Sequence, residues 1–195
     1  LRGKILNTWD LESSIIIESK EIRDISQVLG VIPGSDDISK LRYNRICVLA
    51  DADSDGLHIA TLMCALFLKH FPEIVKKGHV YIAMPPLYRI DVAKEVFYAL
   101  DDSEKNNIIK KINRRKKKSK INIQRFKGLG EMNPAQLKET TISPDSRRLV
   151  QLSVDNGSEE SLKKVYEIMD MLLGKKRAKD RKIWIESNGN IKEIE

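Results

Sequence analysis

With 195 residues, 41% of them hydrophobic, the chain is long enough for one domain, or for one domain with a smaller appendage, and disorder throughout is excluded. Its 35 Lys and Arg against 28 Asp and Glu give a formal net charge of +7, which favours polyanionic partners, above all nucleic acid. Cys47 and Cys64 lie in apolar segments without metal-ligand spacing, which indicates free thiols and excludes a disulfide scaffold.

The longest uncharged apolar stretch runs from Ile59 to Leu68. It is about half of the ~20 residues that a membrane-spanning helix needs, and no signal segment opens the chain. We therefore expect a soluble, intracellular protein with no membrane partner. Because the first residue is Leu1 rather than Met, we also expect the chain to be part of a longer polypeptide.

The first half of the chain is predicted to contain alternating helices and strands. Helical spacing of apolar residues predicts one helix over 15–29, ended by Gly30. A β-branched run predicts a buried strand over 46–50, and an almost wholly apolar segment predicts a helix over 57–71. A second strand is expected over 79–84, before Pro85 and Pro86. This order forms a βαβ unit with a parallel sheet.

The second half begins with a basic block. Residues 105–127 hold eleven Lys or Arg and no acid, which favours an exposed connection or a segment that follows a phosphate backbone. A strand is expected over 121–126, and Asn133 before Pro134 is typical of a helix start. Apolar spacing predicts a helix over 158–173, ended by Gly174. The basic run over 175–182, like the block over 105–127, is either an exposed segment or one that follows a phosphate backbone.

The most informative stretch is the run D-A-D-S-D-G from Asp51 to Gly56, directly after the first predicted strand. In an extended segment, Asp51 and Asp53 point the same way and can converge on one point. Two carboxylates that lie so close together repel each other unless a cation lies between them. Mg²⁺ suits such a site, because it prefers one or two carboxylates together with water and phosphate oxygens.

Three other interpretations compete with a Mg²⁺ site. An EF-hand loop is excluded, because its twelfth position must be Glu and here it is Leu62. An aspartyl-phosphate phosphatase could use Asp51 as nucleophile, although nothing in the basic remainder suggests a small phosphoester pocket. The aspartates could also simply end the strand and cap the next helix, for which one Asp would suffice.

Three long motifs carry a family resemblance: VLADADSDGLHIATLMCALF, KKGHVYIAMPPLYRI and RFKGLGEMNPAQLKETT, with LRGKILN at the start. Together they resemble the B subunits of bacterial type IIA DNA topoisomerases over most of the chain. Ser54, Leu57 and Ala60 are more similar to the topoisomerase IV branch than to the gyrase branch. The resemblance implies an α/β fold: a Rossmann-like TOPRIM parallel sheet with flanking helices over 1–98, incomplete at its N-terminus, and a smaller α+β tail segment over 99–195.

The resemblance also implies site residues. Asp51 and Asp53 match the family's catalytic carboxylates and Mg²⁺ ligands, with Asp55 close to the metal, while a further glutamate ligand belongs to an upstream EGDSA-like motif that this chain lacks. Lys4, Asn7, His58 and Lys127 match or adjoin DNA-binding positions. An ordinary solvated lysine, a helix-entry histidine and a glycine-rich turn remain the alternatives for Lys4, His58 and Lys127.

The implied function is metal-dependent DNA cleavage and religation within ATP-dependent double-strand passage. The implied partners are double-stranded DNA, the topoisomerase IV A subunit, whose tyrosine attacks the DNA within an A2B2 heterotetramer, and quinolone-type drugs at the cleavage site. ATP would be bound outside this segment, and the enzyme would act in the bacterial cytoplasm at the nucleoid, in chromosome segregation. The alternatives are an equivalent gyrase segment, a stand-alone nucleic-acid-binding module and a small Mg²⁺-dependent phosphotransferase.

Overall fold

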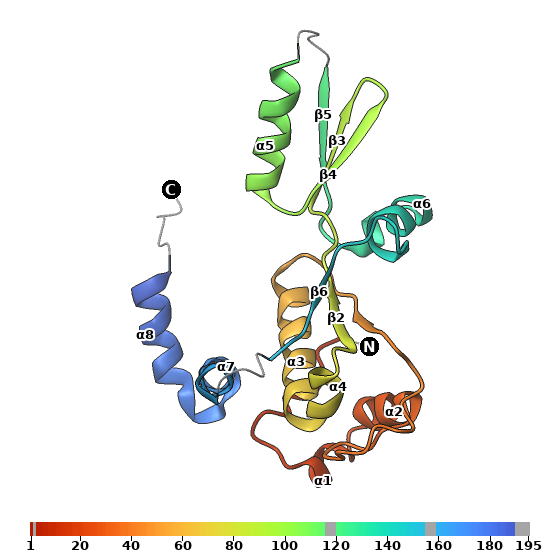
Figure 1. Cartoon of the computed structure of the whole chain (residues 1–195). Helices are drawn as coiled ribbons and strands as arrows, with labels where there is room; N and C mark the ends of the chain where they lie inside the picture. The colour runs from red at the N-terminus through yellow and green to blue at the C-terminus, as the bar shows by residue number, and fades with distance from the viewer. Residues whose placement is uncertain (2, 116–119, 155–158, 190–195) are drawn as a thin grey trace. The chain divides into compact units, whose positions relative to one another are not determined.

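The computed structural model describes residues 1, 3–115, 120–154 and 159–189. Its helices and strands, shown in Figure 1, are α1 (Ser13–Ile16), α2 (Lys20–Leu29), β1 (Ile46–Val48), α3 (Ser54–His70), α4 (Pro72–Lys76), β2 (Val80–Ala83), β3 (Tyr88–Val92), β4 (Glu95–Ala99), α5 (Asp102–Asn113), β5 (Ile121–Arg125), α6 (Pro134–Leu137), β6 (Leu149–Gln151), α7 (Glu159–Leu173) and α8 (Ala178–Asn188). Short 3-10 helices η1 (Leu129–Glu131) and η3 (Lys175–Arg177) and a short π-helix η2 (Lys138–Ile142) complete the described elements. None of the described helices is both long and apolar enough to cross a bilayer.

Internal contacts divide the chain into two compact units. Unit 1 comprises Leu1–Asn44, Leu62–Val80 and Leu152–Glu195, and unit 2 comprises Arg45–Thr61 and Tyr81–Gln151. This division differs from the expected boundary between residues 98 and 99. Strand β6 pairs with β2 and β5 pairs with β3, so that segments from both sides of that boundary build the same two sheets.

Unit 1 is helical in its described parts. The expected single helix over 15–29 is wrong, because α1 and α2 are separate and Ser19 between them has extended dihedral angles. The break falls at Ser19, the N-cap of α2, a position that serine favours. Gly30 ends α2 in the left-handed conformation, as expected. Helix α7 and the stop at Gly174 are confirmed.

Unit 2 contains two three-stranded sheets, with orders β1-β2-β6 and β4-β3-β5. The α/β class is confirmed, and β1, β2 and β5 lie where the sequence predicted strands. The expectation of a parallel sheet does not extend to β6 or to the second sheet: β6 pairs antiparallel with β2, and both pairings of β3 are antiparallel. Strands β3 and β4 were not predicted.

The described residues between 88 and 125 form a small layer of their own, and the span 88–125 is here called the α5 module. Helix α5 lies along one face of the β4-β3-β5 sheet (Figure 1), and the two share a core of Tyr88, Ile90, Val92, Ala99 and Ile112. The prediction of an exposed connection from residue 105 is therefore wrong up to Asn113, because Ile108 and Ile112 give this basic segment an apolar side that packs on the sheet. Residues 116–119 of that connection lie outside the described residues.

Candidate metal site

The acidic run joins β1 to α3, and its second carboxylate caps the helix. Asp53 Oδ1 accepts a hydrogen bond from the Gly56 N–H at 2.7 Å, and the Asp53 carbonyl accepts one from the Leu57 N–H at 3.0 Å. This is the arrangement of an N-cap residue, which satisfies donors that the helix itself leaves unpaired. The helix-capping interpretation of the run is thus correct for Asp53, and α3 begins three residues earlier than predicted.

Asp51 has a different partner, which lies 78 residues away in the sequence. Its Oδ1 accepts a hydrogen bond from the Leu129 N–H at 2.7 Å. Leu129 opens η1, within the motif that runs from Lys127 to Asn133. Two of the three long motifs in the sequence therefore meet at one carboxylate.

Two glycines make this meeting possible by bringing backbone close to Asp51. A Cβ at Gly56 would lie 2.0 Å from the Asp51 carbonyl oxygen, so that any side chain there would displace the acidic run. A Cβ at Gly128 would lie 3.1 Å from Asp51 Oδ1 and 3.2 Å from Oδ2. Glycine has no Cβ and therefore lets another group approach the backbone closely. In the structure, the group that Gly128 approaches is the Asp51 carboxylate.

The rest of that motif is held by its own side chains. Glu131 Oε2 accepts a hydrogen bond from the Lys127 N–H at 2.8 Å. Asn133 caps α6 in a capping box with Gln136, as its position before Pro134 predicted. Sequence reasoning missed the roles of Gly56, Gly128 and Leu129. The glycines were the only available signal, because a backbone N–H donor has no sequence signature.

The donor set around Asp51 fits part of a Mg²⁺ site. Asp51, Asp53 and Asp55 are all exposed, and Asp55 lies in the first turn of α3. Asp51 and Asp53 each direct Oδ1 at a backbone N–H. Within the described ranges, no three His, Cys, Asp or Glu side chains come together in a group that could hold a metal. One or two carboxylates are nevertheless what Mg²⁺ takes from a protein, with water and phosphate oxygens completing its shell.

The four DNA-binding candidates have different surroundings. Lys127 is exposed at the start of the glycine-rich loop, and His58 is exposed on α3, five residues beyond Asp53. Lys4 is exposed in unit 1. Asn7 is partly buried: its Nδ2 donates to the Leu173 carbonyl at 2.8 Å, and its Oδ1 accepts from the Trp9 N–H at 3.1 Å.

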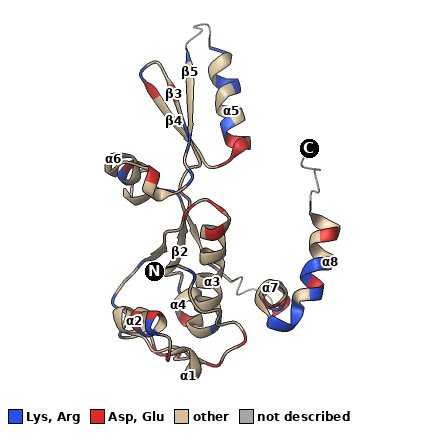
Figure 2. Ribbon diagram, turned by 180° about the vertical axis from the view of Figure 1, so that it is seen from behind, with Lys and Arg blue, Asp and Glu red and all other residues tan. Residues whose placement is uncertain are grey.

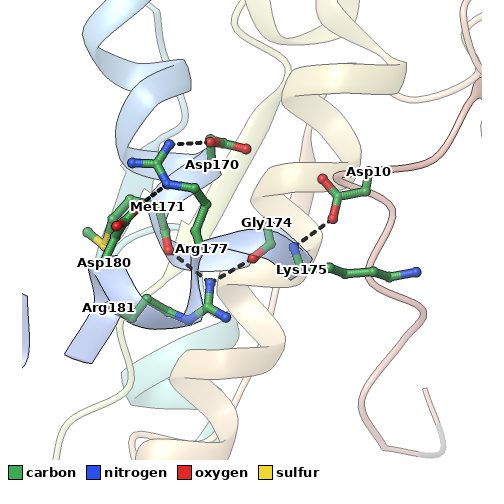
Figure 3. A network of polar contacts seen from close by, with 8 residues as sticks. All are labelled: Asp10, Asp170, Met171, Gly174, Lys175, Arg177, Asp180 and Arg181. Carbon is green, nitrogen blue, oxygen red and sulfur yellow. Dashed lines mark hydrogen bonds and ion pairs between the residues drawn. The ribbon is translucent and has the colours of Figure 1, made fainter. Parts of the chain in front are cut away.

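The contacts of Asn7 belong to a polar network that holds the end of α7. Figure 3 shows Asp10 accepting from the Lys175 N–H at 2.7 Å, and Arg181 donating to the carbonyls of Met171 and Gly174. Arg177 bridges Asp170 and Asp180 across the turn between α7 and α8. Asn7 and Asp10 thus join the N-terminal segment to this turn, which gives Asn7 a structural role.

We expect Asn7→Ala to lower the free energy of unfolding by about 1–3 kcal/mol, because the Leu173 carbonyl and the Trp9 N–H would both lose their partner. Lys20→Ala, at an exposed position of α2, should change it by less than about 0.5 kcal/mol. Urea unfolding of both variants measures this difference. An unchanged stability of Asn7→Ala, together with weaker DNA binding, would instead assign the Asn7 amide to DNA.

Comparison with known proteins agrees with the motifs. The family model described as DNA gyrase B subunit, carboxyl terminus, matches residues 118–186. The B subunit of DNA topoisomerase 4 from Haemophilus influenzae is 60% identical over 190 residues, covering 97% of this chain and 30% of the relative. The Escherichia coli K12 protein of the same name is 58% identical over 195 residues, covering 100% and 30%. The B subunit of DNA gyrase from Thermotoga maritima is 41% identical over 170 residues, covering 87% and 26%.

A solved structure shares the fold. The crystal structure of the Plasmodium falciparum topoisomerase II DNA-binding, cleavage and re-ligation domain aligns with a TM-score of 0.74 and 25% identity, covering 95% of this chain and 24% of that one. The chain spans about 30% of the length of the topoisomerase 4 relatives that it matches. It belongs to the family of bacterial type IIA DNA topoisomerase B subunits.

Proposed function

We propose that this chain is the Mg²⁺-binding part of the B chain of a topoisomerase IV and serves DNA cleavage and religation. The observation that supports this most is the hydrogen bond from the Leu129 N–H to Asp51, which joins the acidic run and the glycine-rich motif into one site. The substrate would be double-stranded DNA. The complete enzyme would pass one duplex through another, with the outcome of decatenation and relaxation.

In this proposal, Asp51 and Asp53 hold the metal with a glutamate from outside the chain, and Asp55 lies close by. Bound Mg²⁺ supplies charge neutralisation at the scissile phosphate and at the departing 3′ oxygen. Asp53 keeps its position because it also caps α3, and Asp51 because the Leu129 N–H fixes its Oδ1. Lys127, exposed beside Gly128, would attract the DNA backbone. The attacking tyrosine would come from the A subunit.

Two other assignments, a gyrase B segment and a stand-alone nucleic-acid-binding module, differ from this proposal in specific ways. A gyrase B segment would have the same metal chemistry, but the two topoisomerase 4 relatives are 58–60% identical to this chain and the Thermotoga gyrase relative 41%, which favours topoisomerase IV. A stand-alone nucleic-acid-binding module would need no carboxylate beyond the helix cap. The contact of Asp51 with a distant motif argues for a built site instead.

The remaining parts of the proposal concern the complete enzyme. It would be an A2B2 heterotetramer that hydrolyses ATP in B-chain regions outside this segment. Its location would be the bacterial cytoplasm, on nucleoid DNA, with a role in chromosome segregation. Quinolone-type drugs would bind where the metal site and the DNA meet the A subunit.

We expect the 195-residue chain alone to hydrolyse no ATP and neither to cleave nor to relax supercoiled plasmid in the presence of Mg²⁺. The physical reason is that the chain carries only part of the metal ligands and no G-x-x-x-x-G-K-[ST] motif. Cleavage should appear only when the chain is supplied with both the upstream B-chain segment and the A subunit. Gel analysis of plasmid incubated with each combination tests this, and relaxation by the chain alone would contradict the proposal.

A further inference from the structure

The positive charge of this protein is concentrated in one place. The α5 module, residues 88–125, has twelve Lys and Arg against five Asp and Glu, an excess of seven. That excess equals the formal net charge of the whole chain, +7, so the other 157 residues balance at 23 against 23. The candidate metal site, by contrast, lies outside the module, at Asp51, Asp53 and the 127–131 loop. The field that attracts polyanions therefore originates mainly in the module.

The five acids of the module are all engaged in local contacts. Four form ion pairs, Asp91 with Arg89, Glu95 with Arg115, Asp102 with Lys105 and Glu104 with Arg148, and Asp101 caps α5 through the Glu104 N–H. Three of them lie at or just before the start of α5, whereas its last turns are basic (Figure 2). Little negative charge is left to neutralise the later part of the helix.

Three cations lie on one side of that later part. Lys110 and Lys111 are adjacent, and Arg114 follows them at spacings of four and three residues, so the three share one face at the end of α5. All three are exposed, and none has an ion-pair partner among the described residues. We call them the α5 basic face. The opposite side of the helix, with Ile108 and Ile112, packs on the sheet.

We propose that the α5 basic face binds the phosphate backbone of duplex DNA, as a contact additional to those at the cleavage site. A rigid helix that presents three cationic side chains, with Cβ atoms about 5–6 Å apart at spacings of three and four residues, matches a polyanion with closely spaced charges. An anionic membrane surface fits less well, since a helix that binds membranes needs a free apolar side, and that of α5 is covered by the sheet. The proposal rests on the proposed function for its ligand, DNA.

Such contacts would be independent of base sequence and sensitive to salt. Each phosphate contact contributes about 0.9 to the slope of the logarithm of the binding constant against the logarithm of salt concentration. Loss of two or three contacts should thus lower that slope by about 2–3, equally for different sequences. The contribution of the module to affinity would be largest at low salt.

The test compares two triple variants of this chain that carry the same net charge. One is Lys110→Gln, Lys111→Gln, Arg114→Gln, and the control is Lys20→Gln, Arg23→Gln, Lys40→Gln, at exposed cations of unit 1. Both have a formal net charge of +4, since each loses three cations from +7. Binding to a labelled duplex is measured by anisotropy at several salt concentrations, with a thermal melt to verify folding.

We expect the α5 variant to lower the salt slope by about 2–3 and the control by less than about 0.5. Equal slopes in the two variants would overturn the proposal, because net charge rather than its location would then govern binding. Loss of binding to anionic vesicles with an unchanged DNA slope would overturn it in favour of a membrane. If the triple variant melts early, the three single variants replace it, each expected to lower the slope by about 0.9.

The result does not depend on catalysis. Failure of the proposed function would appear in the plasmid cleavage assay of the complete enzyme, with this chain still binding DNA through α5. Failure of the present proposal would appear in the salt slope, with cleavage intact. The two outcomes are therefore distinguishable.

Discussion

Replacing Asp51 by asparagine is expected to lower Mg²⁺-dependent DNA cleavage by the complete enzyme at least ~10²-fold. Asparagine keeps the size of the side chain and an oxygen that can accept the Leu129 N–H, so the local fold should persist. What it removes is the negative charge, which strengthens the binding of a hard cation such as Mg²⁺. A variant that folds normally and does not cleave would identify Asp51 as a metal ligand rather than a loop anchor.

Asp53 needs a different substitution, because the structure gives it a second role. Asp53→Ala would remove both the carboxylate and the cap of α3, and the lost cap alone costs about 1 kcal/mol. Asp53→Ser retains a capping oxygen and removes the carboxylate. We expect Asp53→Ser to lose cleavage by a similar factor while melting close to the unaltered protein. Cleavage within twofold of the unaltered enzyme, for either Asp51→Asn or Asp53→Ser, would refute its role as a ligand.

The sequence indicated those elements whose signal is local. The β-branched run at 46–48, the run at 80–83 and the apolar spacing of 159–173 each depend on neighbouring residues, and each element is present. The hairpin of β3 and β4 escaped prediction despite the alternation in Tyr-Arg-Ile-Asp-Val, because its turn lacks the usual Asn-Gly or Asp-Gly signal. The turn uses Ala93 instead, with a positive φ of 55°.

Helix α5 was missed for a related reason. Its apolar side is short, and the dense charge around it favours an exposed connection when it is considered without the sheet. Only the pairing of β3 with both β4 and β5 creates the surface on which Ile112 is buried. The candidate site likewise depends on contacts that the sequence does not show. Asp51 and the glycine-rich loop could each be identified in the sequence, but their hydrogen bond depends on the folded path of the chain between two residues 78 positions apart.

That hydrogen bond leads to a prediction at Gly128, a residue that touches no ligand itself. A methyl group there would lie 3.1–3.2 Å from the Asp51 carboxylate atoms, closer than ordinary van der Waals contact, so the carboxylate would have to shift by a few tenths of an ångström. The backbone conformation allows alanine, because Gly128 has a φ of −165°, which is extended and open to any residue. Gly128→Ala should therefore act on the orientation of Asp51 and leave the loop folded.

We expect Gly128→Ala to raise the Mg²⁺ concentration that gives half-maximal cleavage about 10-fold or more, as is typical when a group that orients a metal ligand is disturbed. Gly130→Ala is the matched control in the same loop, because a Cβ there meets nothing within 4 Å, and it should stay within about twofold. The affinity for Mn²⁺, measured directly by electron paramagnetic resonance on the enzyme without DNA, should fall in parallel, and this measurement does not depend on turnover. If the two alanine variants require equal metal concentrations, the Leu129 contact only holds the loop in place and does not position Asp51. A higher metal requirement in Gly128→Ala alone, with unchanged cleavage at saturating Mg²⁺, would place the effect on metal binding and not on the chemical step.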